Sequence, residues 1–356
     1  MPVISLDRVS KRYGGTTAVR ELSLSVERGE MFGLIGPDGA GKTTTIRLVC
    51  GLLPADGGSV RVLDFDPVRD HRRMTRSVGY LSQRFSLYGD LSIDENIAFF
   101  AEIHGVRDYR ARRDRLLEMM QLAPFRARLA DRLSGGMKQK LALACTLVHE
   151  PALIVLDEPT TGVDPVSRRE FWKLLSEFLS QGITIVMATP YLDEAERCSR
   201  VALLHEGRLL ALDRPDALRA TLPGALFEVI VSDHRRAPDV LKGIAGVTGV
   251  QMFGERAHVL MARGDAATAD LLASSLARAG LAAASVRPLA ASPRATASAI
   301  RWLVSSPRWM ASSSVSRTAA ASGGWASAAA GSSASKAARR VTGFMQASRA
   351  VDEAAR

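Results

Sequence analysis

The chain contains few cysteines and aromatic residues, and it has no long apolar run. Only three cysteines occur among 356 residues, and aromatic residues make up 6%. Cys50, Cys145 and Cys198 form no C-x-x-C pair, which argues against a disulfide scaffold and a thiolate metal site. We expect these thiols to be buried and inert in a reducing compartment. Because no apolar stretch reaches about 18 residues, the sequence predicts no membrane span.

The amino terminus also lacks the pattern of a signal peptide. Residues 1–8 contain no charged segment followed by an apolar run, so we expect a cytoplasmic protein. Hydrophobic residues make up 47% and charged residues 24%, which are globular values that exclude a wholly disordered or fibrous chain. At about 100–200 residues per domain, the length predicts two or three domains.

The net charge of +10 is concentrated at the carboxyl end, in residues 291–356. The nearly balanced remainder disfavours a nucleic-acid-binding surface. This tail is rich in Ala and Ser with scattered Arg, a composition that buries too little apolar surface to offset chain entropy. We therefore expect it to be disordered. Trp302, Trp309 and Trp325 stand among Ala and Ser, which suggests a frame-shifted end, a hypothesis that an intact reading frame on resequencing would remove.

Apolar patterning predicts an α/β domain over residues 1–222. Alternating residues at 3–8 and 21–26 are typical of half-buried strands, whereas apolar runs at 31–35, 153–156 and 183–187 are typical of buried strands. A helical stretch at 166–181 separates two of these runs. Buried strands separated by helices indicate a mostly parallel sheet covered on both faces. Residues from about 92 to 140 predict a helical insert, with a break at Pro124.

A second pattern predicts a small domain over residues 225–290. Strands are expected at 226–231 and 283–286, helices at 238–244 and 266–279, and a hairpin at 250–261 around Gly254-Glu255. This β-α-β-β-α-β order is that of a ferredoxin-like α+β domain. Such folds serve many functions, so the domain alone does not indicate one.

A Gly-rich segment after the strand at 31–35 indicates phosphate binding. Residues 36–43, GPDGAGKT, match G-x-x-x-x-G-K-[ST] between a strand and a helix. The backbone N–H groups of such a loop surround phosphate oxygens, Lys42 reaches the β- and γ-phosphates, and Thr43 ligates Mg²⁺. The alternative is a turn that merely joins strand to helix. The expected nucleotide-binding residues are Gly36, Asp38, Gly39, Ala40, Gly41, Lys42, Thr43 and Thr44.

Two adjacent acids follow the buried strand at 153–156. Neighbouring strand residues point to opposite faces, so Asp157 and Glu158 are expected to have different roles. We expect Asp157 to hold Mg²⁺ and Glu158 to orient or deprotonate the attacking water. Acids at strand ends are common, and it is their position after a phosphate-binding loop that makes this pair specific.

The segment 133–140, LSGGMKQK, lies between these two motifs. By itself it predicts a helix capped by Ser134, or a second anion site formed by Ser134, Gly135 and Gly136. Together, the motifs at 36–43, 133–139 and 157–164 resemble those of the ATP-binding domain of ABC transporters over residues 1–220. The resemblance implies a P-loop NTPase fold that binds ATP and Mg²⁺ and hydrolyses ATP.

The same resemblance implies further site residues. Tyr13 matches the aromatic residue that stacks on adenine, Gln83 the glutamine that senses Mg²⁺ and the membrane partner, and Asp164 the acid at the dimer interface. The implied catalytic residues are then Glu158, Lys42 and Gln83, and the implied metal ligands are Thr43, Gln83 and Asp157.

Two positions depart from the family pattern. The family has a histidine that contacts the γ-phosphate where this chain has Pro190, and proline offers neither a side-chain donor nor an N–H. His205 lies past the next strand and is not expected to replace it. The departure implies a weakened site or a partner that supplies its own histidine. Asp38 replaces the usual asparagine, and an acid near phosphates is unfavourable unless it faces away.

In the family, two such domains form a head-to-tail homodimer or heterodimer, with each ATP between one P-loop and the other subunit's signature motif. The resemblance implies a separate ABC-2 type membrane subunit, a location on the inner face of the cell membrane, and export of a small hydrophobic or drug-like molecule. Two alternatives are a degenerate regulatory subunit that binds ATP without turnover, and a soluble ABC ATPase acting on nucleic acid or the ribosome. No direct nucleic-acid partner is expected.

Overall fold

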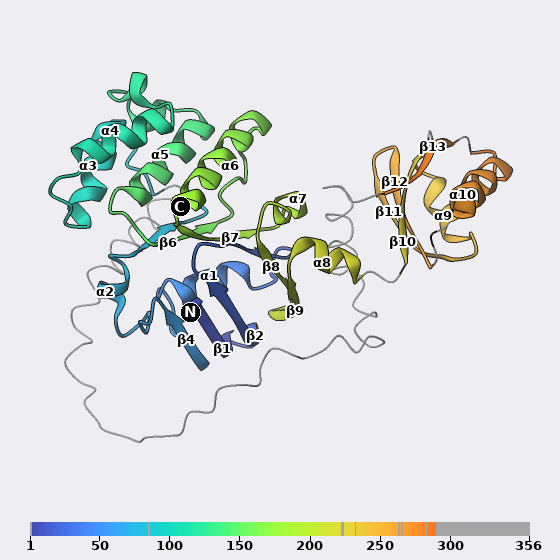
Figure 1. The fold of residues 1–356 in the computed structure, drawn as a ribbon, viewed down its shortest axis with the longest axis horizontal. Coiled ribbons are helices and arrows are strands. Elements are labelled where there is room, and N and C mark those ends of the chain that lie inside the picture. The colour runs from blue at the N-terminus through green and yellow to red at the C-terminus, as the bar shows by residue number, and fades with distance from the viewer. Residues whose placement is uncertain are drawn as a thin grey trace. The chain divides into compact units, whose positions relative to one another are not determined.

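The computed structural model describes residues 2–84, 86–221, 224–231, 233–262, 264, 266–281 and 283–289, which form three sheets (Figure 1). The predicted tail at 291–356 lies outside the described residues, so its expected disorder stays a prediction. None of the helices in the described part of the chain is long and apolar enough to cross a membrane. Cys50, Cys145 and Cys198 are buried and unpaired, as predicted, and burial raises the pKa of each thiol.

The largest sheet is mostly parallel, which confirms the prediction. Its strands, in spatial order, are β5 (Val78–Leu81), β6 (Leu153–Asp157), β7 (Thr184–Thr189), β3 (Met31–Ile35), β8 (Arg200–His205) and β9 (Arg208–Asp213). All neighbours run parallel except β8 and β9. Since parallel neighbours share one direction, the carboxyl ends of β3, β6 and β7 meet at the same edge of the sheet.

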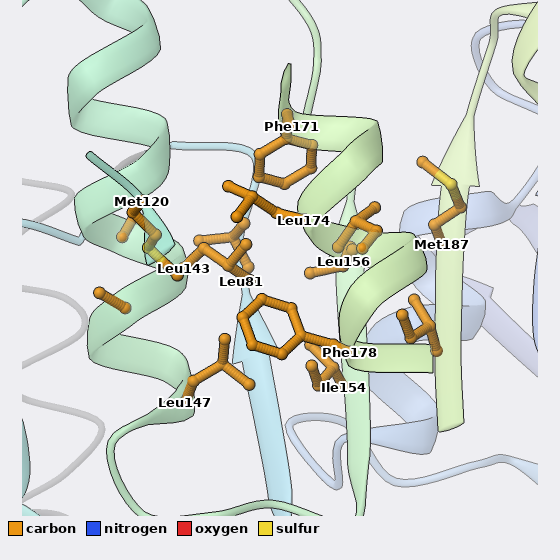
Figure 2. Packing of buried hydrophobic residues seen from close by; sticks show 14 of the residues in the cluster. Leu81, Met120, Leu143, Leu147, Ile154, Leu156, Phe171, Leu174, Phe178 and Met187 are labelled. Atoms are coloured by element: carbon orange, nitrogen blue, oxygen red, sulfur yellow. The ribbon is translucent and has the colours of Figure 1, made fainter. Parts of the chain in front are cut away.

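Both faces of this sheet are covered. Alternate residues of each strand point to opposite faces and therefore enter two different cores. On one face, α5 (Gly135–Leu147) and α6 (Pro165–Ser180) contribute apolar side chains that meet those of the sheet (Figure 2). The labelled residues of this core are Leu81, Met120, Leu143, Leu147, Ile154, Leu156, Phe171, Leu174, Phe178 and Met187. On the other face, α1 (Lys42–Val49) and a second sheet complete the core.

That second sheet is antiparallel, with the order β2 (Thr16–Glu27), β1 (Pro2–Tyr13) and β4 (Gly57–Val62). The half-buried strands predicted at 3–8 and 21–26 are parts of β1 and β2, and their alternating apolar residues face the shared core. Both strands are longer than predicted, because register shifts let the pairing continue through their polar ends. β4, β5 and β9 were not predicted.

Most of residues 93–147 are helical, where a helical insert was predicted at about 92–140. They form α3 (Ile93–Ile103), α4 (Arg110–Met119), two short 3₁₀ turns at Ala123–Phe125 and Ala130–Arg132, and α5. α3 begins with a capping box in which Ser92 and Glu95 exchange hydrogen bonds. The expected break at Pro124 falls in the first 3₁₀ turn. The remaining helices of residues 2–221 are α2 (His71–Met74), α7 (Leu192–Ala195) and α8 (Pro215–Ala220).

Residues 225–288 have the predicted ferredoxin-like order. β10 (Ala225–Val231), α9 (Ala237–Lys242), β11 (Val247–Phe253), β12 (Arg256–Met261), α10 (Ala266–Arg278) and β13 (Ala283–Pro288) follow one another. Their strands form an antiparallel sheet in the order β11-β12-β10-β13. Glu228 on β10 is fully buried and bonds Arg256 and Arg287, which ties the two neighbouring strands to the centre of the sheet.

Two histidines stack beside the helical segment. The rings of His104 and His149 lie 3.8 Å apart with an angle of 4° between their planes. The Nε2 atom of His149 lies 3.3 Å from the Val78 carbonyl oxygen. Burial lowers the pKa of His149 to about 4, with the nearby charges of His104 and Arg112 adding to the effect, and burial also lowers the pKa of His104. The folded state therefore favours neutral rings.

This stack predicts a loss of stability in mild acid. Between about pH 6.5 and pH 4, His149 binds more protons in the unfolded chain than in the folded chain, so its contribution to stability is complete above this window and lost as the pH falls through it. His149 alone is expected to lower the free energy of unfolding by about 2 kcal/mol between pH 7 and pH 5. Urea titrations at both pH values measure this difference. The effect should shrink in His149→Gln but persist in His234→Gln, which changes an exposed histidine; an unchanged effect in His149→Gln would contradict the assignment.

Candidate functional site

The phosphate-binding loop runs from the end of β3 to the start of α1, the context that the motif requires. Its glycines meet steric demands, because a Cβ on Gly36 would lie 2.3 Å from the Leu204 carbonyl oxygen. Gly41 has φ +97°, and its Cβ would lie 2.5 Å from the Ala18 carbonyl oxygen. α1 begins at Lys42 without a side-chain cap, so its first-turn N–H groups are available to an anion.

Five polar side chains from three segments meet beside this loop. The Thr43 hydroxyl donates to Oδ1 of Asp157 over 3.0 Å. Nζ of Lys42 lies 3.5 Å from Oε1 of Glu158, and Lys42 also donates to the Pro37 carbonyl oxygen at 3.1 Å. The Gln83 amide, which follows β5, donates to Oε2 of Glu158 over 3.1 Å. The structure thus brings the predicted catalytic residues and metal ligands together.

The two acids differ in backbone and environment. Asp157 is the last residue of β6, whereas Glu158 follows it with φ +50°, a left-handed conformation that is rare outside glycine. The strand alternation ends there, so both carboxylates approach the loop instead of pointing to opposite faces. Burial raises the pKa of the Asp157 carboxyl, although the hydrogen bond from Thr43 counteracts this.

The residues present fit ATP and Mg²⁺. Thr43, Gln83 and Asp157 offer hydroxyl, amide and carboxylate oxygens, the ligand types that Mg²⁺ takes in proteins. The Lys42 side chain is only 4% exposed, and its Nζ is held by the Pro37 carbonyl oxygen of the loop. Asp38 was expected to be tolerated only if it faced away, and its side chain is 95% exposed, with Oδ1 4.0 Å from Nζ of Lys42.

The second predicted anion site does not lie on the elements that carry the phosphate-binding loop and the two acids. Ser134 caps α5 and accepts a hydrogen bond from the Met137 N–H at 3.3 Å, as the capping reading predicted. α5 packs against α3, β5 and α6. Gly136 lies against Ser167, since a Cβ there would be 2.3 Å from its Oγ, and Asp164 caps α6 by accepting from the Val166 and Ser167 N–H groups. Ser134, Gly135, Gly136 and Asp164 therefore form a group of their own at the starts of α5 and α6.

The remaining two predicted positions lie at the ends of strands. Tyr13 ends β1 with 45% of its surface exposed, so its ring is free to stack on a planar ligand. Pro190 follows β7 directly and is half-buried. No imidazole occupies position 190 in this chain, and the N–H next to it, from Tyr191, donates to Oγ1 of Thr189 at 3.0 Å.

The sequence analysis missed one group of residues at this edge of the sheet. Glu194 on α7 is 1% exposed and accepts hydrogen bonds from Thr160, Thr189 and Trp172. Burial raises the pKa of its carboxyl. Thr160 and Thr189 are hydroxyl residues at or just after strand ends, a signal that could have pointed to the group. The sequence around Glu194 is rich in charged residues, so it did not indicate that this acid is buried.

Comparison with known proteins finds relatives among the ATP-binding proteins of ABC transporters. The family model for ABC transporters matches residues 19–161. The chain is 46% identical over 236 residues to the probable multidrug ABC transporter ATP-binding protein YbhF of Escherichia coli K12, covering 65% of this chain and 41% of that protein. It is 37% identical over 250 residues to the daunorubicin resistance ATP-binding protein DrrA3 of Streptomyces coeruleorubidus, covering 69% and 79%.

Solved structures show the same fold. The dimeric bacterial ABC transporter cassette MJ0796 is similar with a TM-score of 0.53 and 26% identity, over 59% of this chain and 98% of that one. The chain spans 41% of the length of YbhF and most of the length of DrrA3. The matched region contains both the phosphate-binding loop and the acids that face it. The chain therefore belongs to the family of ABC transporter ATP-binding proteins.

Proposed function

We propose that the chain binds and hydrolyses MgATP as the ATP-binding subunit of an ABC exporter. The observation that carries this proposal is the convergence of Lys42, Thr43 and Gln83 on Asp157 and Glu158 beside an uncapped helix start. A lysine, a hydroxyl and two acids in this arrangement can bind a triphosphate and activate water. A turn that merely joins strand to helix would not need these contacts.

Each residue then has a separate task. The N–H groups of the loop and Lys42 hold the β- and γ-phosphates, which neutralises the charge that develops during transfer. Mg²⁺, when held by Thr43, Asp157 and Gln83, supplies further charge neutralisation on the phosphate oxygens. Glu158 accepts a proton from the attacking water, and Gln83 holds its Oε2 in place. Tyr13 stacks on the adenine.

We further propose that ATP closes a head-to-tail dimer. Ser134, Gly135, Gly136 and Asp164 lie at the starts of α5 and α6, and these two helices pack against each other. In a head-to-tail pair, they would face the phosphates held by the partner's loop. ATP would then join the two subunits, and hydrolysis would release them. The dimeric state of the similar cassette supports a dimer; a homodimer and a heterodimer are both consistent with it.

The exporter role follows from the relatives, which are named for multidrug transport and daunorubicin resistance. We propose a separate ABC-2 type membrane subunit, a location on the inner face of the cell membrane, and a drug-like substrate. We propose that the ATPase domain spans residues 1–222 with its helical insert at about 92–140, and that the small domain spans 225–290. These relatives favour transport over the alternative of a soluble ATPase that acts on nucleic acid or the ribosome.

Pro190 favours one alternative function, that of a regulatory subunit that binds ATP without hydrolysing it. The convergence of Gln83 and Lys42 on Glu158 favours turnover. The test is steady-state phosphate release by the full purified chain at saturating MgATP, beside ATP binding measured by calorimetry. Turnover supports the proposal, whereas tight ATP binding without phosphate release would leave the regulatory reading in its place.

The same assay tests how much Pro190 lowers the rate of ATP hydrolysis. Pro190→His introduces a donor near the γ-phosphate, so we expect kcat to rise at least about tenfold, a conservative share of what one such donor contributes. Pro190→Ala is the matched control, because it removes the ring without adding an imidazole and should leave kcat within about twofold. Equal gains in both variants would show that backbone freedom, not the imidazole, was limiting.

A further inference from the structure

The buried carboxylate of Glu194 accepts hydrogen bonds from three segments next to the proposed site. Glu194 lies on α7 with 1% of its surface exposed. Its Oε1 accepts from the Thr160 hydroxyl and from Nε1 of Trp172 at 3.4 Å, and its Oε2 accepts from the Thr189 hydroxyl at 2.7 Å. A buried acid with this many donors is satisfied, and it restrains the segments that supply them.

These donors come from three segments that follow Glu158 in the chain. Thr160 stands two residues after Glu158, in the loop that leaves β6. Thr189 is the last residue of β7, directly before Pro190, and Trp172 lies on α6, which Asp164 caps. The Glu194 carboxylate thus fixes the loop after β6, the loop after β7 and the helix α6 relative to one another.

The loop held by Thr160 sets the position of Glu158. The Glu158 N–H donates to the Ala188 carbonyl oxygen at 2.9 Å, and the Thr161 N–H donates back to the Glu158 carbonyl oxygen at 3.2 Å. The Thr161 hydroxyl also lies 3.4 Å from Oε2 of Glu158. Because Glu158 has a left-handed backbone at φ +50°, this conformation persists only while its surroundings hold it.

The loop after β7 is fixed by the same carboxylate. Oγ1 of Thr189 donates to Glu194 and accepts from the Tyr191 N–H, so its two hydrogen bonds span Pro190. The Arg168 guanidinium stacks on the Tyr191 ring at 4.7 Å and lies near the Glu194 charge. This loop is therefore held by bonds to the protein rather than by a side chain at position 190.

We propose that Glu194 is a positioning residue for hydrolysis, which acts through Thr160 to hold Glu158 in its productive orientation. This inference rests on the proposed ATPase function and deepens it. It assigns to this chain a fixed support for Glu158 that needs no imidazole at position 190. Loss of the Thr160 hydroxyl should free the loop after β6 while leaving the phosphate-binding residues in place.

The test compares Thr160→Val, which removes the hydroxyl at nearly constant volume, with Thr160→Ser, which keeps it. We expect Thr160→Val to lower kcat about tenfold or more, because small displacements of a catalytic group are costly, while the Kd for MgATP changes less than about twofold. Thr160→Ser should restore kcat. Glu194→Leu, which removes both accepting oxygens, should follow Thr160→Val in direction.

Thr146→Val is the matched control, because the buried Thr146 hydroxyl donates only to the Ala142 carbonyl oxygen within α5. It should leave kcat unchanged at a similar stability cost. A kcat for Thr160→Val equal to that of Thr146→Val would overturn the inference, as would equal losses in Thr160→Val and Thr160→Ser.

Amide hydrogen exchange gives a readout that does not depend on turnover. The Thr161 and Val163 N–H groups donate within the loop at 3.2 Å each, and their exchange should be at least about threefold faster in Thr160→Val than in Thr160→Ser. Unchanged exchange would overturn the positioning role even if the wild-type chain showed no ATPase activity. Absent turnover in the wild type would instead count against the proposed function.

Discussion

Replacing Glu158 with glutamine is expected to abolish measurable MgATP turnover while preserving ATP binding. The amide keeps the shape of the side chain and an oxygen that can accept from Gln83, but it cannot take a proton from water. Loss of a positioned general base lowers the rate by about 10²–10⁴-fold. The negative charge near the phosphates also disappears, so the affinity for ATP should stay the same or rise.

Phosphate release at saturating MgATP and calorimetric ATP binding measure the two halves of this expectation. Glu30→Gln is the matched control. Its side chain is 11% exposed, close to the 10% of Glu158, and it pairs with Arg200 beside the opposite end of β3. The control should retain wild-type kcat. Turnover by Glu158→Gln near the wild-type rate would show that another group activates the water.

Replacing Lys42 with alanine is expected to remove most of the affinity for MgATP. Lys42 is buried between the loop carbonyl of Pro37 and the Glu158 carboxylate, so its charge is held beside the phosphate-binding N–H groups. Losing a buried charged contact costs about 2 kcal/mol or more, which raises the Kd at least about thirtyfold. The variant also leaves Glu158 without its cation, so turnover should fall as well.

The thermal shift produced by MgATP reports this loss directly, because a ligand that binds only the folded state raises its melting temperature. Lys140→Ala serves as the control. Lys140 is similarly buried and pairs with Glu170 at 2.7 Å, on α5 and α6. It should keep the wild-type shift. An undiminished shift in Lys42→Ala would place the phosphates elsewhere in the chain.

Local patterns predicted well where neighbouring residues along the chain form the feature. The phosphate-binding loop is one such case, because a strand, a glycine turn and a helix start are adjacent from Met31 to Lys42. The ferredoxin-like order of residues 225–288 is another, because the apolar residues of each strand and each helix recur with the spacing typical of that element. β4 and β9 were missed for the converse reason: Gly57–Val62 begins with two glycines, and Arg208–Asp213 lacks alternation.

The Glu194 group could not be predicted in this way. Thr160, Thr189 and Glu194 lie in segments whose side chains meet only because β6 and β7 are parallel neighbours that end at the same edge of the sheet. Nothing near Glu194 in the sequence shows that its carboxylate is buried, since it stands among other charged residues. The left-handed backbone of Glu158 was equally invisible, because glycine is the residue that normally signals it.

The amino-acid sequence by itself determined which residues are proposed to carry the chemistry, because the order Gly36–Thr43, Ser134–Gly136 and Asp157-Glu158 depends on spacing along the chain. It also determined that position 190 has no imidazole. Only the tertiary structure decided how these residues meet. Parallel pairing of β3, β6 and β7 brings Lys42 to Glu158 across more than a hundred residues. Ser134 instead lies at the start of α5, which is a different element from those that carry Lys42 and Glu158. Such distances are set by strand register and helix packing, which act between segments rather than along them.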